Sequence, residues 1–413
     1  MYIQGGAGLR QVVAPNLRAW SGGADGWQRE MPMHGGFGEP VAPIPPCIPT
    51  PPWLTLFKHY VVAKEPRIAS HSPFRGGWET TAAVSPLKPV TLNPGYIHPT
   101  TGALQLDPNL DPKLKALMGN LFAGRPPFDK DPYKRFVSNG GKIRVALVDL
   151  STDKKSLFPT IAEYNSSTMS YAASLAKIGA LYGAYQLKFD LNAEAKKNPT
   201  AMTAARVGAL KKMFDVTRVG SPPTLVFDFN NTLLRPMNEI CENSAAAQVI
   251  MAIGFRYLAS ALWQSGLYDC RRGGIWLGSS YGGSAWNRDP IANQSAAVNA
   301  LSVATYFTLL AQGRLINAGS SRSIKMHLVA QRAFCRSFFE EGLRAVKQFT
   351  NDDYMYSKIG IYETFYHEGA LIHHCRTGKK YVAAVLTEAG AGFGADILSS
   401  LIAHLDSLVR TNP

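Results

Sequence analysis

Ser174 and Lys177 form the residue pair with the most direct chemical potential in this chain, in the segment Ser174-Leu175-Ala176-Lys177. Positions three apart on a helix lie on one face, so the Lys177 amine can approach the Ser174 hydroxyl. A serine hydroxyl is a poor nucleophile until a base removes its proton, and a desolvated lysine can be that base. The spacing also arises by chance, and a solvated lysine near a buried serine is the simpler interpretation of the pair alone.

Two downstream segments change that interpretation. Cys241-Glu242-Asn243 precedes the helical stretch that begins at Ser244, and Ser357-Lys358-Ile359-Gly360 lies within a strand pattern. The three segments occur in the order that serine enzymes with an S-x-x-K motif use. Asn243 is equally suited to cap the helix that follows it. The set predicts acyl transfer through an activated serine.

The elements that must position these residues follow from hydrophobic periodicity. Strands are predicted at Lys142–Leu150, Thr160–Tyr164, Ser357–Thr364, Ala370–Cys375 and Tyr381–Leu386. Helical spacing predicts helices at Pro112–Phe122, Ser174–Leu187, Thr203–Phe214, Ser244–Ser265, Gln294–Gln312, Ser323–Phe349 and Gly394–Leu408. Because the strands flank a long helical block, we expect one shared antiparallel sheet with an inserted helical lobe at about 172–349. Ser174 should begin a buried helix where the two parts face each other.

The pattern resembles the β-lactamase and penicillin-binding-protein superfamily of active-site serine enzymes, nearest to its class A-like branch. Cys241-Glu242-Asn243-Ser244-Ala245-Ala246 is similar to the S-D-N-T-A-A segment of that family, and 303–316 resembles its late helix and the turn after it. Residues 379–387 resemble its last strand. The resemblance covers about 113–413 and implies an α+β fold, an α/β sandwich whose antiparallel sheet is flanked by terminal helices.

The resemblance also implies roles for individual residues. Ser174 would be the nucleophile and Lys177 its base, with Asn243 orienting a substrate amide. Lys358 would supply positive charge, and Gly360 would let substrate backbone approach the strand closely. The backbone N–H groups of Ser174 and Ile361 would form the oxyanion hole.

Three departures from the family pattern qualify these roles. Cys241 stands where the family has a serine that relays a proton to the leaving group, so a thiol would have to replace that hydroxyl. Ile359 replaces the usual Thr or Ser of K-[ST]-G. The stretch 266–290, where class A enzymes carry their deacylating Glu, has only Asp269 and Asp289 as acids. Penicillin hydrolysis by that route is not expected.

Residues 1–112 form a Pro- and Gly-rich segment with interleaved aromatic residues, which we interpret as an extension that wraps around the domain at 113–413. The formal charge of +14 is spread along the chain without a known nucleic-acid-binding motif, so no specific nucleic acid is expected. No apolar run approaches the ~20 residues of a membrane span, and the first residues do not have the pattern of a secretory signal. We therefore expect a cytoplasmic location.

The five cysteines are scattered without a C-x-x-C pair, which predicts reduced thiols and no zinc site. In His373-His374-Cys375, neighbouring side chains of a strand would point to opposite faces, so a structural role is favoured over a metal site. No cofactor or metal is expected. The sequence thus predicts a serine hydrolase or acyltransferase that acts on a small-molecule or peptide-like ester or amide. The alternative is a catalytically inactive binding or scaffold protein with the same fold.

Overall fold

The computed structural model describes residues 92–151, 158–197, 216–219, 224–227, 234–269, 272–281, 288–289, 291–329, 335–389 and 393–412. Two regions singled out in the sequence lie outside these ranges: 1–91 of the Pro- and Gly-rich extension, and the helix predicted at Thr203–Phe214.

A five-stranded antiparallel sheet forms the centre of the fold, with the strand order β10-β11-β12-β1-β2. Its strands are β1 (Lys142–Asp149), β2 (Ala162–Tyr164), β10 (Tyr354–Tyr362), β11 (Phe365–His373) and β12 (Lys380–Glu388). The central pair β1 and β12 is in register from Lys142 opposite Glu388 to Asp149 opposite Tyr381. The antiparallel sheet assembled from strands far apart in the sequence is confirmed.

The sheet is buried on both faces, which explains why its central strands are almost continuously apolar. Along β1 and β12, alternate residues face two different cores, because successive side chains of a strand point to opposite faces. Val145 and Val385 belong to one core, and Ala146 and Ala384 to the other. The first core lies under the helices near the chain ends, and the second joins the sheet to the helical lobe.

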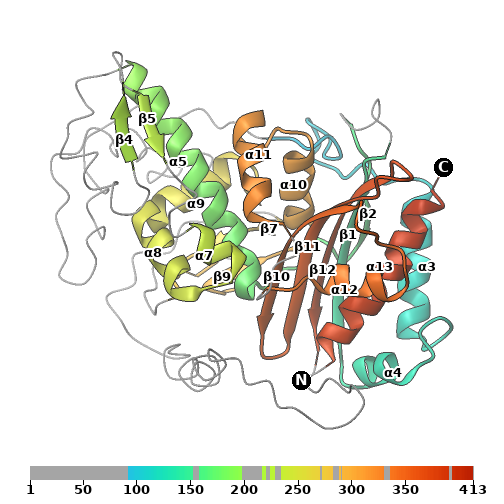
Figure 1. Cartoon of the computed structure of the whole chain (residues 1–413). Helices are drawn as coiled ribbons and strands as arrows, with labels where there is room; N and C mark the ends of the chain where they lie inside the picture. The colour runs from blue at the N-terminus through green and yellow to red at the C-terminus, as the bar shows by residue number, and fades with distance from the viewer. Residues whose placement is uncertain are drawn as a thin grey trace, which may run out of the picture.

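Helices close to the two ends of the described chain cover the first face of the sheet (Figure 1). They are α3 (Leu110–Phe122), α4 (Asp131–Ser138), α12 (Phe338–Ala345) and α13 (Gly394–Arg410). The amphipathic helix predicted at Gly394–Leu408 is therefore confirmed. Against the opposite face lies α10 (Ala300–Ala311), which contacts β1, β11 and β12.

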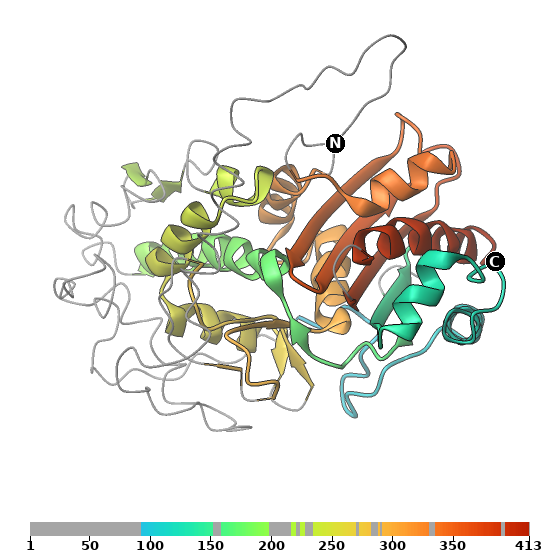
Figure 2. The same cartoon turned by 90° about the horizontal axis from the view of Figure 1, so that it is seen from below.

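The helical lobe lies to one side of the sheet, as the view from below shows (Figure 2). It contains α5 (Lys177–Lys197), α7 (Leu234–Glu239), α8 (Asn243–Ile253), α9 (Phe255–Gln264) and α11 (Ala318–His327). Two predicted helices are each interrupted. The helix predicted at Ser244–Ser265 breaks at Gly254, whose φ of 85° is a backbone conformation that glycine adopts readily. The helix predicted at Ser323–Phe349 consists of the end of α11 and, after a break, α12.

Short strands supplement the lobe. One small sheet has the order β3-β9-β8, with β3 at Ser170–Tyr171, β9 at Ala296–Val298 and β8 at Trp276–Leu277. Two further pairs are β4 (Val216–Val219) with β5 (Thr224–Phe227), and β6 (Tyr268–Asp269) with β7 (Gly273–Gly274). The predicted helix at Gln294–Gln312 therefore begins with a strand, and Asn299 caps α10 by accepting a hydrogen bond from the Ser302 N–H.

The described end of the N-terminal extension packs on the domain. The Leu92 N–H donates to the Ser265 carbonyl (3.0 Å), and the Tyr96 hydroxyl lies 2.7 Å from Thr305 Oγ1. No single helix in the described ranges is long and apolar enough to span a membrane; α8 and α9 reach the required length and composition only together, across a bend of 85°.

Candidate active site

The turn that carries Ser174 connects the small sheet to the first helix of the lobe. The chain leaves β3 at Tyr171, forms the 3₁₀ turn η2 (Ala173–Ala176), and enters α5 at Lys177. Side chains three apart eclipse each other in a 3₁₀ turn, so Ser174 and Lys177 share one face more closely than on an α-helix. Ala173 has a φ of 45°, a strained backbone for a residue with a Cβ. The helix that was predicted to begin at Ser174 begins instead at Lys177, and Ser174 lies in the 3₁₀ turn that leads into it.

Strand β10 lies directly against this turn (Figure 1). Gly360 faces the turn so closely that an added Cβ would lie 2.7 Å from the Ala172 carbonyl oxygen and 2.8 Å from the Leu175 nitrogen. Only glycine permits this approach without displacing backbone. Gly360 therefore brings the strand that carries Lys358 and Ile361 against the turn that carries Ser174.

Lys177 is completely buried, and its amine is held by two acceptors from the segment of the second motif. Nζ donates to the Cys241 carbonyl oxygen and to Asn243 Oδ1, each at 2.7 Å. Burial lowers the pKa of Lys177 well below its ordinary value, and the positive charge of Lys358 lowers it further, whereas Glu242 opposes the shift. A neutral amine has two N–H donors, which these acceptors use, and a lone pair that remains to accept a proton.

Lys358 reaches the same segment from the sheet. Its Nζ lies 2.9 Å from Cys241 Sγ and donates to the Ile359 carbonyl oxygen at 3.1 Å. Burial lowers the pKa of Lys358 to about 7, and the nearby Glu368 raises it in part. The lysines of the first and third motifs thus meet at Cys241, one at its carbonyl oxygen and one at its sulfur.

The state of Cys241 differs from the expectation. Cys241 forms a disulfide with Cys335, 94 residues later, with 6.2 Å between the Cα atoms. The prediction of reduced thiols throughout is therefore wrong for this pair, because the fold brings together two cysteines that their spacing did not connect. Cys241 also has a φ of 57°. In this state it has no S–H with which to relay a proton.

Tyr281 completes the surroundings of Lys177 and was not singled out from the sequence. The Tyr281 hydroxyl donates to the Ala173 carbonyl oxygen at 2.6 Å, in the turn that carries Ser174. The Lys177 Nζ lies 4.8 Å from the centre of its ring. Tyr281 follows the strand Trp276–Leu277 and contacts the site itself.

His367 contacts the strand that leads into the Ser174 turn. Its Nε2 lies 2.7 Å from the Tyr171 carbonyl oxygen, and since a carbonyl can only accept, Nε2 carries the hydrogen. Burial lowers the pKa of His367 to about 4. His367 lies inside β11, and the hairpin turn between β10 and β11 falls between Tyr362 and Phe365.

Glu368 is a buried carboxylate whose charge acts on Lys358. It accepts hydrogen bonds from the Ser337 hydroxyl and from the Phe339 N–H, the latter at 2.9 Å. Burial raises the pKa of Glu368 to about 7, and its charge acts on Lys358. Ser337 follows Cys335 by two residues, so the disulfide and Glu368 are anchored to one segment.

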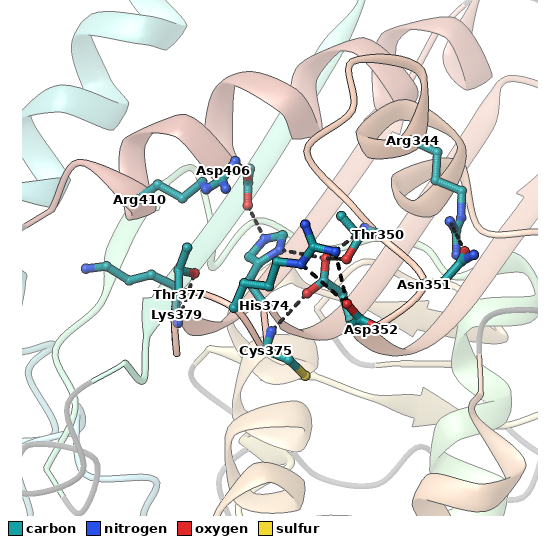
Figure 3. A network of polar contacts seen from close by, with 12 residues as sticks. Arg344, Thr350, Asn351, Asp352, His374, Cys375, Thr377, Lys379, Asp406 and Arg410 are labelled. Carbon is teal, nitrogen blue, oxygen red and sulfur yellow. Dashed lines mark hydrogen bonds and ion pairs between the residues drawn. The ribbon is translucent and has the colours of Figure 1, made fainter.

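The segment His373-His374-Cys375 has a structural role. Figure 3 shows His374 facing Asp406 of α13; Nε2 lies 2.6 Å from Asp406 Oδ1, which also accepts from the Tyr381 hydroxyl at 2.8 Å. Nδ1 lies 3.5 Å from Asp353. Among the described residues, no group of three or more His, Cys, Asp or Glu side chains is arranged to hold a metal ion. The network joins α13 to the sheet on the face away from Lys177.

Comparison with known proteins identifies the family. A sequence model of the beta-lactamase enzyme family matches residues 133–405. The chain belongs to this family. Membership supports activity of the serine-hydrolase type.

Solved structures similar to this chain are distant in sequence. PBP-A is 11% identical, with a TM-score of 0.48, over 74% of this chain and 97% of its own. A β-lactamase from Xanthomonas campestris is 15% identical, with a TM-score of 0.47, over 73% and 99%. A β-lactamase from Sphaerobacter thermophilus is 14% identical, with a TM-score of 0.45, over 67% and 95%. A comparison with curated proteins gave no match.

Proposed function

We propose that the protein is a serine hydrolase or acyltransferase that acts on an ester or amide through an acyl-Ser174 intermediate. The observation that carries this proposal is the state of Lys177, a fully buried amine whose two donors are occupied and whose pKa is lowered. Such an amine is neutral at a pH where an exposed lysine is charged. It can therefore act as a base toward the hydroxyl three residues before it.

The proposed reaction has two steps. Ser174 Oγ attacks the substrate carbonyl carbon while Lys177 Nζ takes the hydroxyl proton, and the backbone N–H groups of Ser174 and Ile361 stabilise the oxyanion. The bond to the leaving group then breaks, which leaves an ester on Ser174; a weakly basic leaving group departs as its anion, and an amine departs with the proton passed on from Lys177 through the second motif. In the second step, water, an amine or an alcohol attacks this ester and restores the hydroxyl. Asn243, already bound to Lys177, and the cation of Lys358 orient the substrate.

We infer an acceptor other than water in the second step from the side chain that stands beside Lys177. Tyr281, not a carboxylate, contacts the Lys177 amine from the stretch 266–290, and the Tyr281 hydroxyl is engaged with the Ala173 carbonyl. Tyr281 therefore does not act as a general base that activates water. We propose transfer of the acyl group to an amine or alcohol acceptor, with an ester or amide metabolite as the acyl donor.

The test uses a covalent probe. Wild-type protein and Ser174→Ala are incubated with a fluorophosphonate, and intact masses are measured, with the exposed Ser138→Ala as a matched control. One adduct on wild type and Ser138→Ala, and none on Ser174→Ala, supports the proposal. An equal adduct on Ser174→Ala contradicts it.

A second experiment separates transfer from hydrolysis. Acyl-enzyme formed from an activated ester is mixed with increasing concentrations of a simple amine, and the ratio of amide to free acid is measured. A rising fraction of amide together with faster turnover supports transfer. Turnover in water as fast as with amine removes the transferase part and leaves the hydrolase.

An inactive scaffold protein is the second candidate, favoured by the disulfide at Cys241, which removes the hydrogen of the proton-relaying position. Failure of the oxidised and the reduced protein alike to form an adduct at Ser174 with fluorophosphonate or labelled penicillin would favour this candidate.

A further inference from the structure

We propose that the Cys241–Cys335 disulfide is a thiol–disulfide exchange site, reduced by a dithiol, whose reduction supplies the missing proton donor for expulsion of the leaving group. This inference rests on the proposed acyl-serine function. In the oxidised protein the second motif has no S–H. In the reduced protein a Cys241 thiol stands beside both catalytic lysines.

The position of Cys241 between the two lysines is the first observation. Its carbonyl oxygen accepts from Lys177, and its sulfur lies 2.9 Å from Lys358 Nζ. A disulfide sulfur can only accept from this amine, and weakly, whereas a thiol can also give a proton. The same sulfur therefore changes from an inert neighbour to an acid when the disulfide is opened.

The anchoring of Cys335 is the second observation. Cys335 lies two residues before Ser337, whose hydroxyl binds Glu368 inside the sheet, and Cys241 belongs to the helical lobe. The disulfide therefore connects the lobe to the sheet at the active site. Both cysteines are half-buried, so a small dithiol can reach them.

The exchange step balances as follows. A thiolate of the dithiol attacks Cys335 Sγ, a mixed disulfide forms, and Cys241 leaves as a thiolate beside Lys358. Attack on Cys335 is favoured because the lower-pKa thiol leaves faster, and a neighbouring lysine lowers a thiol pKa. The second thiol of the reductant then attacks the mixed disulfide and releases Cys335. Two electrons and two protons pass from the dithiol to the protein, and the reductant becomes a disulfide.

The consequence depends on the leaving group. An aryl ester loses a weakly basic phenoxide that needs no proton, whereas an amide must be protonated on nitrogen as its C–N bond breaks. The oxidised protein should accordingly handle activated esters, and reduction should extend its range to amides. A larger effect of reduction on amides than on esters distinguishes a proton relay from a change in the flexibility of the whole site, which would affect both substrates equally.

The experiment compares a p-nitrophenyl ester with the matched p-nitroanilide, before and after treatment with dithiothreitol. We expect reduction to accelerate acylation by the anilide about a hundredfold, in the range of general acid catalysis, and that by the ester less than about threefold. Cys335→Ser and Cys241→Ser should react like the reduced protein with or without dithiol. Cys241→Ala should be slow with the anilide in both conditions, and Cys375→Ser, outside the site, should behave as wild type.

Two results would overturn the inference: equal acceleration of ester and anilide by dithiothreitol, or no change in either. A third readout does not depend on Ser174. Iodoacetamide labelling of folded Ser174→Ala protein, followed by mass measurement, should show Cys241 and Cys335 only after reduction.

Lys358 lies 2.9 Å from the Cys241 sulfur and is itself influenced by Glu368, whereas Lys177 contacts the Cys241 carbonyl oxygen and is influenced by Glu242. Resistance of the disulfide to reduction in the folded protein contradicts the exchange site. Loss of Ser174 adducts with normal reduction contradicts the proposed function instead.

Discussion

Replacement of Gly360 by alanine tests whether the approach of β10 to the turn that carries Ser174 sets the geometry of the site. A Cβ at this position would lie 2.7 Å from the Ala172 oxygen, 2.8 Å from the Leu175 nitrogen and 3.0 Å from the Leu175 Cβ. The first contact is about 0.7 Å shorter than ordinary van der Waals contact at 3.4 Å. Two of the three atoms are backbone and cannot rotate away, so the strand or the turn must shift.

The magnitude follows from this shift. Overpacking of this kind costs about 1–3 kcal/mol of folding free energy. A displacement near 1 Å of reacting groups can slow a reaction on the order of a hundredfold. We expect Gly360→Ala to lower the free energy of unfolding by about 2 kcal/mol and to slow acylation of Ser174 on the order of ten- to a hundredfold.

The assay pairs urea unfolding with the rate of adduct formation with a fluorophosphonate. Gly119→Ala is the matched control, because Gly119 lies exposed in α3 with nothing within 4 Å of an added Cβ. It should gain about 0.5–1 kcal/mol, the usual helical gain of alanine over glycine, with an unchanged rate. Wild-type stability and rate in Gly360→Ala would refute the reasoning.

Three further predictions concern groups around the site. Tyr281→Phe should slow acylation at an unchanged pH midpoint, because it removes only the hydroxyl bound to Ala173. Tyr281→Leu should instead move the midpoint upward, because it exposes Lys177 to water. The pH–rate profiles of the two variants distinguish these effects, and identical profiles would contradict the role of the Tyr281 ring in burying Lys177. Glu368 has a folded-state pKa of about 7, above its unfolded value, so its stabilising contribution is present at low pH and is lost as the pH rises through 7. Glu368→Gln should remove on the order of 3 kcal/mol of this pH dependence between pH 5 and 8 in urea titrations, and an unaltered slope would argue against it. Asp406→Ala, which leaves His374 and Tyr381 without their buried partner, should cost about 3 kcal/mol yet leave the pH midpoint of acylation where it is; a shifted midpoint would place this network in the site.

Much of the fold follows from local pattern. The strands β1, β10, β11 and β12 are buried, aliphatic and bounded by turns, and the order of strands and helices allows few arrangements besides one sheet with an inserted lobe. The boundaries of the helices within the lobe were harder to predict from the sequence. An apolar run such as Ser244–Ser265 satisfies helical spacing on both sides of Gly254, so periodicity alone does not show the break.

The candidate site divides in the same way. Spacing and order marked Ser174, Lys177, Lys358 and Asn243, because these residues sit in short motifs. Three residues reach the site through contacts between segments that are 94 to 196 residues apart in the sequence. His367 contacts Tyr171, Tyr281 contacts Ala173, and Cys335 is bonded to Cys241. Such contacts form only when the sheet and the lobe come together. The sequence signal for the disulfide was Cys335 itself, but its pairing with Cys241 becomes evident only in the folded chain.

The location of the covalent bond tests the central claim most directly. Wild-type protein reduced with dithiothreitol is incubated with labelled penicillin, quenched in acid and digested, and the labelled peptide is sequenced by mass spectrometry. We predict a single labelled peptide that contains 174–177, with the penicilloyl mass on Ser174. A label on any other residue, or none on this peptide while the protein is folded, would contradict the account.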